Sequence, residues 1–171
     1  MASRDQLLNS LMKHIYDNVK PSDYSLKFRG DLLKKNEKTP LWIVKGARRD
    51  MQDKNRIEIN ESKQSSLITQ RLGNNSLELI PFFIRVVLLN EDDKDFFPDL
   101  SLIEAAILDH EYFWIYDDLN GKNSSQKKSK YRIAKVSTAK NQIESSADSN
   151  TDDVNTSEIR IYRVWVQNVR A

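Results

Sequence analysis

The chain has 171 residues, the usual length of one domain, and carries a net charge of only +2 although 30% of its residues are charged. A net charge this small gives no strong overall field, so affinity for nucleic acid would have to come from a local patch. The sequence contains no cysteine, which excludes disulfide frameworks, thiolate zinc sites and cysteine nucleophiles.

The sequence also lacks the patterns of a signal peptide, a membrane-spanning helix, a phosphate-binding loop and a histidine metal site. The N-terminus is polar, and the longest apolar run, 79–89, is about half the length that a helix needs to cross a bilayer. Only four glycines are present, so no glycine-rich phosphate cradle can be built, and neither histidine has metal-ligand spacing. We therefore expect one cytoplasmic domain over residues 1–171, with no cofactor, no metal and no membrane partner.

The first part of the chain predicts two helices and two strands. Apolar residues recur at helical spacing over 4–19, after a capping box, and predict a helix that the polar, irregular segment 20–39 follows. The β-branched run 41–44 and the alternating run 56–59 predict a hairpin of two strands, the second at an edge. Residues 61–72 precede a glycine and predict a short helix.

The middle of the chain predicts the centre of the sheet. Residues 77–89 are almost entirely apolar and predict a central strand, and a capping box at Ser101 predicts a helix of about three turns. The aromatic run 111–117 and the segment 130–136 predict strands that pair antiparallel, because the link between them is rich in Asn, Gly and Ser.

The last part of the chain changes character twice. Residues 138–157 are mostly small polar or acidic residues and predict a long disordered loop. Residues 158–169 are apolar on both faces and predict a strand inside the sheet. The fold class is therefore α+β: a mainly antiparallel sheet of about five or six strands with two or three helices packed on it.

Two arginines interrupt otherwise apolar strands. Arg85 is a permanent charge in the central strand, and burying it unpaired would be costly. We expect it to pair with a carboxylate such as Glu78 or Glu104; the alternative is an anion site in a cleft. Arg163 is a similar case on the last strand, on the same predicted face as Trp165.

The charges of the chain are segregated about its most aromatic segment. Residues 91–118 hold ten acidic residues and one basic residue, and residues 122–140 hold seven basic residues and no acid. This layout favours a non-enzymatic binding or regulatory protein that contacts another protein, or a second copy of itself, through separate acidic and basic surfaces. The expected contact residues are Asp92, Asp93 and Asp95 on the acidic surface, and Lys127, Lys128, Lys130, Arg132, Arg48 and Arg49 on the basic one.

Binding of DNA or RNA is the alternative function. The basic segments 122–135 and 45–56 could neutralise phosphates. Tyr112, Trp114 and Tyr116 share one face of a strand by the period of two, and they could stack bases if that face were open. Aromatic rows of this kind more often pack into a core, which is the interpretation that we favour here.

A metal-dependent nuclease is the third candidate. Asp50 or Asp53, followed by Glu58 or by Glu61 and Lys63, is similar to the acidic pair and lysine that position a metal ion and water for phosphodiester hydrolysis. The last two of these residues follow the predicted strand instead of lying on it, so this function ranks below the other two.

Overall fold

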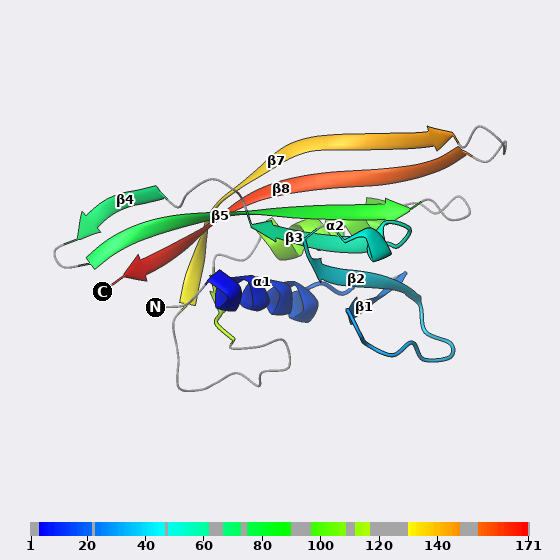
Figure 1. Cartoon of the computed structure of the whole chain (residues 1–171), viewed down its shortest axis with the longest axis horizontal. Coiled ribbons are helices and arrows are strands. Elements are labelled where there is room, and N and C mark those ends of the chain that lie inside the picture. Colours follow the sequence, from blue (N-terminus) through cyan, green and yellow to red (C-terminus); the bar gives the residue numbers. More distant parts are fainter. Residues whose placement is uncertain are drawn as a thin grey trace.

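The computed structural model of the protein describes residues 4–21, 23–46, 48–61, 67–72, 75–89, 97–108, 112–116, 130–147 and 154–170. Within these residues, two α-helices and one short 3-10 helix accompany a single eight-stranded sheet (Figure 1). The elements in chain order are α1 (Arg4–Asn18), β1 (Tyr24–Phe28), β2 (Thr39–Lys45), η1 (Arg49–Met51), β3 (Arg56–Glu61), β4 (Leu67–Leu72), β5 (Asn75–Leu89), α2 (Phe97–Leu108), β6 (Tyr112–Trp114), β7 (Lys130–Ala147) and β8 (Val154–Arg170).

The sheet is mixed and runs in the order β1-β2-β3-β5-β8-β7-β6, while β4 pairs with β5 outside this path. β1, β2 and β3 are parallel neighbours, and the remaining described ladders are antiparallel. The α+β class is thus confirmed. The sheet has more strands than the five or six expected, because β1 and β4 form in segments that the sequence pattern assigned to a connection and to a helix.

Several predicted elements are confirmed. The predicted first helix is α1, the predicted central strand is β5, and the helix beginning near Ser101 is α2, which starts at Phe97. β6 and β7 pair antiparallel as expected, with Phe113 opposite Tyr131. β8 lies inside the sheet between β5 and β7, as its two apolar faces indicated.

The predicted hairpin of 41–44 with 56–59 is wrong. β2 and β3 run parallel, with Ile43 opposite Ile57, and the chain between them crosses over the sheet by way of η1. β3 is also not an edge strand, since β5 lies on its other side. The alternation of charged and apolar residues was misleading because Arg56 and Glu58 pair with each other and are buried.

Two further predictions are corrected. The helix expected over 61–72 is the strand β4 where it is described, because pairing with β5 satisfies the backbone of this segment and overrides its weak helical pattern. The loop expected over 138–157 is a strand at all its described positions, 138–147 in β7 and 154–157 in β8. The two strands stay paired as far as Ala147 and Val154, with register shifts at Ile133/Lys135 and Thr138/Lys140. Hydrogen bonds between the strands therefore stabilise a segment whose composition offers little apolar surface.

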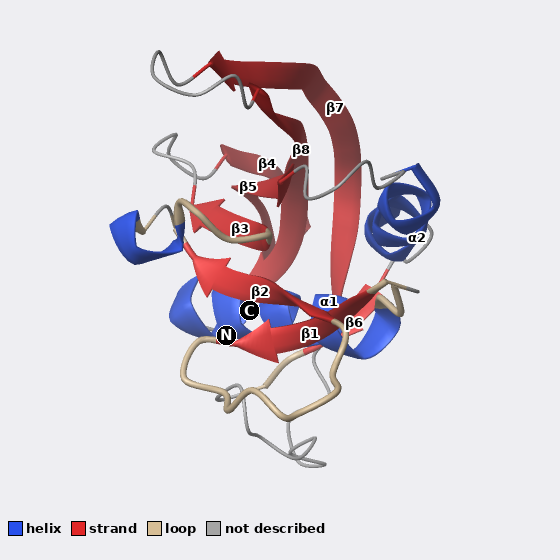
Figure 2. Ribbon diagram, turned by 90° about the vertical axis from the view of Figure 1, so that its right-hand side faces the viewer, coloured by secondary structure: helices blue, strands red, loops and turns tan. Residues whose placement is uncertain are grey.

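Both helices share one hydrophobic core with one face of the sheet. Successive side chains in a strand point to opposite faces, so every second residue of β2, β3, β5 and β8 enters this core. Figure 2 shows the curved sheet with α2 on one side of it and the short helix η1 on the other. The largest fully buried side chains of the core include Leu7, Leu11 and Ile15 of α1, Leu41 and Ile43 of β2, Ile57 and Ile59 of β3, Phe82, Ile84 and Leu88 of β5, and Tyr162 of β8.

A cluster of three residues fastens α2 to the sheet. Glu104 of α2 accepts hydrogen bonds from the guanidinium of Arg160 at 2.6 Å and from the hydroxyl of Tyr162, both on β8. Burial alone would raise the pKa of Glu104, but these two hydrogen bonds outweigh it and lower the pKa below its ordinary value. Burial, and then the hydrogen bond to Glu104, raise the pKa of Tyr162.

Candidate functional site: the helix-free face of the sheet

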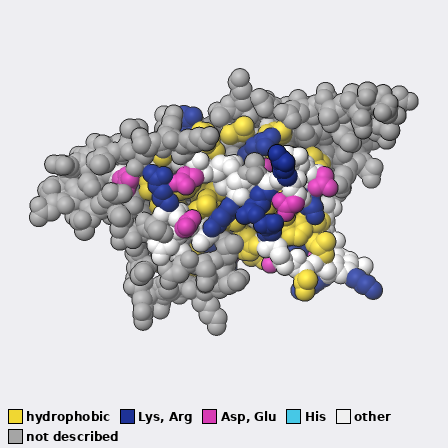
Figure 3. Space-filling view, viewed as in Figure 1, with side chains coloured by type: hydrophobic (Ala, Val, Ile, Leu, Met, Phe, Trp, Pro, Cys, Tyr) yellow, Lys and Arg dark blue, Asp and Glu magenta, His cyan; other side chains and the backbone are white. Residues whose placement is uncertain are grey.

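The opposite face of the sheet carries neither α1 nor α2, and we call it the helix-free face. Its residues alternate with those of the core, and the register of the ladders aligns them from strand to strand. Figure 3 views this side of the molecule and shows lysine and arginine side chains gathered near its centre, beside hydrophobic ones. The helix-free face consists of Trp42 and Val44 of β2, Arg56 and Glu58 of β3, Phe83 and Arg85 of β5, and Ile161, Arg163 and Trp165 of β8.

Arg163 lies against two aromatic rings on this face. Its guanidinium carbon is 5.0 Å from the ring centroid of Phe83 and 5.6 Å from that of Trp165. Phe83 is the residue directly opposite Arg163 in the ladder of β5 with β8, and all three side chains are half-buried. A guanidinium over aromatic rings is attracted by their π electrons, and the planar group keeps a flat surface for stacking.

A buried carboxylate organises the arginines of the neighbouring strands. Glu58 is 1% exposed and accepts a hydrogen bond from Nε of Arg56 at 2.6 Å, and it also pairs with Arg85 at 3.4 Å. Arg85 therefore has a carboxylate partner as predicted, but the partner is Glu58 and neither Glu78 nor Glu104. Because two guanidinium groups share one carboxylate, this cluster keeps a net positive charge, and the side chain of Arg85 is 30% exposed.

The connection from β2 to β3 adds more positive charge on the same side. Met51 of η1 packs with Trp42 and Val44 of the helix-free face, so η1 lies against that face. Arg48 and Arg49, two of the predicted contact residues, are exposed at the start of η1. η1 thus brings Arg49 to this side of the sheet, whereas Arg48, just before η1, lines a pocket together with Met12 of α1 and Ile43 of β2.

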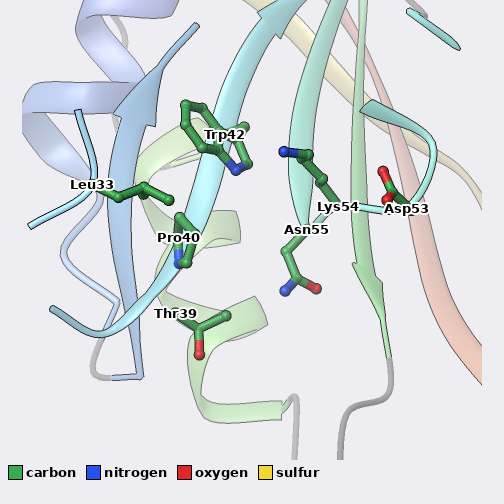
Figure 4. Close-up of a pocket in the computed structure, with 7 residues that line it drawn as sticks. All are labelled: Leu33, Thr39, Pro40, Trp42, Asp53, Lys54 and Asn55. Carbon is green, nitrogen blue, oxygen red and sulfur yellow. The ribbon is translucent and has the colours of Figure 1, made fainter. Parts of the chain in front are cut away.

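A pocket of about 230 Å³ opens beside Trp42 (Figure 4). Leu33, Pro40 and Trp42 line one side of it, and residues that immediately precede β3 line the other. The ammonium of Lys54 lies 5.4 Å from the ring centroid of Trp42, a cation–π contact. The pocket is small for an organic cofactor, and its lining includes the ammonium group of Lys54 beside the ring of Trp42. Its full lining is Leu33, Thr39, Pro40, Trp42, Asp53, Lys54 and Asn55.

Five of the remaining predicted contact residues lie on parts of the chain that the structure does not describe, and two lie on β7. Asp92, Asp93, Asp95, Lys127 and Lys128 lie outside the described residues. Lys130 and Arg132 lie on β7, where they stand opposite Trp114 and Tyr112 of β6 in the ladder.

The predicted aromatic row does not form one platform. Trp114 is 37% exposed, whereas Tyr116 is 9% exposed and lies beyond the end of β6. Phe113 and Ile115, between them, are buried in the core. Arg163 instead lies against Phe83 and Trp165 on the helix-free face. The sequence placed Trp165 on the same face as Arg163 by the period of two, but it gave no signal that Phe83 of another strand would lie beside them.

Three of the acidic residues of the nuclease hypothesis belong to separate ion pairs, Asp53 lines the pocket beside Trp42, and Lys63 lies outside the described residues. Glu58 pairs with Arg56, Asp50 with Arg29 at 3.1 Å, and Glu61 with Arg4 at 2.6 Å. Within the described parts of the chain, no group of three or more His, Cys, Asp or Glu residues could hold a metal ion.

No protein-family model and no curated protein matches this chain. In the portion that the structure describes, no helix has the length and apolarity that crossing a bilayer demands.

Proposed function

We propose that this chain is a non-enzymatic binding protein whose helix-free face contacts an anionic macromolecule. The observation that carries the proposal is the half-buried cluster of Arg163 with Phe83 and Trp165 at the centre of a sheet face that neither α-helix covers. The other charged groups there support it, because Arg56 and Arg85 share the single carboxylate of Glu58.

Single-stranded nucleic acid is the anionic partner that this face fits best. Single strands bind where cations track the phosphates and where flat groups, aromatic or guanidinium, stack on the bases. Arg163 with its two rings offers flat groups, and Arg85 and Arg49 offer cations on the same side. A duplex offers no unstacked bases, so it would use only the cations.

The test is fluorescence anisotropy of labelled single-stranded RNA, single-stranded DNA and duplex DNA, each titrated with the full chain at two salt concentrations. We expect tighter binding of the single strands, weakening as salt rises. Arg163→Gln should reduce affinity by about tenfold, the order expected for losing one stacking contact and one charge. The matched control is Arg4→Gln, which removes an exposed arginine from α1 on the other side of the sheet.

Two results would overturn the nucleic-acid assignment. One is no binding to any of the three probes at low salt, and the other is binding that Arg163→Gln and Arg4→Gln weaken equally. If Lys127→Glu, Lys128→Glu and Lys130→Glu together abolish binding while Arg163→Gln does not, the basic segment 122–135 is the nucleic-acid surface instead.

A protein partner, or self-association through opposite charges, remains the alternative proposal from the segregated charges of the sequence. It predicts that the sedimentation coefficient of the protein depends on concentration. It also predicts that Asp92→Lys, Asp93→Lys and Asp95→Lys together remove this dependence.

A further inference from the structure

The connection between β1 and β2 exposes two neighbouring leucines to solvent. Leu32 is 84% exposed and Leu33 is 62% exposed. Scattered apolar side chains are normal on protein surfaces, but two adjacent, largely exposed leucines at one loop tip form an apolar patch. Leu33 also lines the pocket beside Trp42 (Figure 4), so Leu32 and the exposed part of Leu33 make up this patch. In Figure 1 this connection extends away from the sheet at the lower right.

The loop is built to hold this conformation. At its start, the carboxylate of Asp31 accepts a hydrogen bond from the backbone N–H of Phe28 at 2.7 Å, and the N–H of Asp31 donates to the carbonyl of Phe28 at 3.0 Å. After the leucines, Glu37 accepts from the backbone N–H of Lys34 at 3.2 Å and from Nζ of Lys27 at 2.9 Å. The leucines are therefore fixed at the tip by bonds on both sides.

The tip also carries more basic than acidic residues. The hydrogen bond from Lys27, and then that from the Lys34 backbone, lower the pKa of Glu37, so it remains ionised and paired with Lys27 within the loop. Asp31 keeps its negative charge at the base of the loop, where it accepts from the backbone of Phe28. Figure 3 shows hydrophobic and basic side chains projecting together at the lower right. The exposed cations next to the leucines are Lys34, Lys35 and Lys38.

We propose that this tip, Leu32 to Lys38, docks the protein on an anionic lipid bilayer. The two leucines enter the boundary between headgroups and acyl chains, and the three lysines contact anionic headgroups. A bilayer suits the tip better than a protein partner does. A protein would need a cavity shaped to receive the leucines, whereas a fluid bilayer with anionic headgroups can take up apolar side chains that have lysines beside them. The sequence predicted no membrane partner because no segment could span a bilayer, but docking by a loop needs no span.

This inference is independent of the proposed function of the helix-free face. The experiment is co-sedimentation of the full chain with phosphatidylcholine vesicles, with and without phosphatidylserine, at low and physiological salt. We expect binding only to the vesicles with phosphatidylserine, stronger at low salt. Arg163→Gln should leave vesicle binding unchanged, whereas it should weaken nucleic-acid binding, so the two proposals can fail separately.

Two double variants separate the apolar and the electrostatic contributions. Lys34→Glu with Lys35→Glu should weaken binding by about thirtyfold or more, from the usual contribution of each lysine near an anionic leaflet. Leu32→Ser with Leu33→Ser should weaken it by about tenfold or more, because apolar surface no longer leaves water. All four side chains are exposed, so both variants should fold, which circular dichroism checks.

Matched controls use exposed residues elsewhere. Leu102→Ser removes a leucine that is 44% exposed on α2, and Lys20→Glu reverses an exposed lysine just after α1. Neither should alter vesicle binding. The proposal is overturned if phosphatidylserine vesicles do not sediment the protein at low salt. It is also overturned if the leucine double variant binds as well as the unaltered chain, which would mean that the lysines only adsorb to any anionic surface.

Discussion

Glu58 on β3 stands directly opposite Arg85 on β5 in the sheet, and the two side chains form an ion pair of 3.4 Å. Glu58 also pairs with Arg56 at 2.6 Å, so two guanidinium groups from adjacent strands share one buried carboxylate. Burial of this group is tolerated because each charge has a partner. The ion pair also fixes the position of Arg85, whose side chain is partly exposed on the helix-free face.

The first prediction concerns this carboxylate. Glu58→Gln should destabilise the fold by about 3–5 kcal/mol, because it leaves the guanidinium of Arg56, itself 5% exposed, without a compensating charge. The free energy of unfolding from urea denaturation measures the effect. Glu61→Gln is the control: its pair with Arg4 is exposed, and the change should be below about 1 kcal/mol. Equal losses in the two variants would contradict the assignment.

The second prediction concerns a hydrogen bond between α1 and the segment after β6. Oγ of Ser10, which is fully buried, accepts a hydrogen bond from the backbone N–H of Tyr116 at 2.7 Å and donates to the carbonyl of Gln6. Ser10→Ala should cost about 1–3 kcal/mol of stability, because the N–H of Tyr116 is then buried without that acceptor. Thermal unfolding measures it, and an unchanged melting temperature would refute the contact.

The third prediction is a pH dependence from the cluster that fastens α2. The pKa of Glu104 is lower in the folded protein than its ordinary value of 4.5, so its contribution is fully present above about pH 4.5 and is lost as pH falls further. Glu104→Gln should therefore cost more stability at pH 7 than at pH 3. Urea denaturation at both pH values tests this, and an equal loss at both would exclude ionised Glu104 as the cause.

Tyr162 should show the opposite pH dependence. Its pKa is raised in the folded protein, so its contribution is present below the ordinary tyrosine pKa of 10 and is lost as pH rises above it. Tyr162→Phe should remove part of the alkaline loss of stability, measured between pH 8 and pH 11.

The last prediction concerns tryptophan exposure. Trp114 is 37% exposed and Trp42 is 7% exposed, so acrylamide should quench Trp114 fluorescence far more efficiently. Trp114→Phe should lower the readily quenched emission, and half-buried Trp165 should account for part of what remains. If the quenchable fraction is unchanged in that variant, the aromatic segment around β6 does not pack as the structure shows.

Much of the fold could be predicted because its strongest local patterns agree with the tertiary structure. Helical spacing predicted α1, a long apolar run predicted β5, and apolar residues on both faces predicted that β8 lies inside the sheet. These predictions hold because burial of apolar surface dominates folding, so the apolar face of each helix or strand must pack against another part of the protein.

The candidate site could not be predicted in the same way. Phe83 and Arg163 are eighty residues apart in the sequence, and only the antiparallel register of β5 with β8 sets them opposite each other. The partner of Arg85 was misassigned for the same reason, since several carboxylates were available along the chain and only the ladder of β3 with β5 brings Glu58 to it.

The sequence by itself determined the α+β class, the first helix, the central strand and the need of Arg85 for a carboxylate, because these follow from periodicity and from the cost of burying a charge. Only the tertiary structure decided the parallel order of β1, β2 and β3, the strand conformation of β4 and of the far ends of β7 and β8, and the gathering of aromatic rings and arginines on the helix-free face. These features depend on hydrogen-bonded pairing between distant segments, which local composition does not encode.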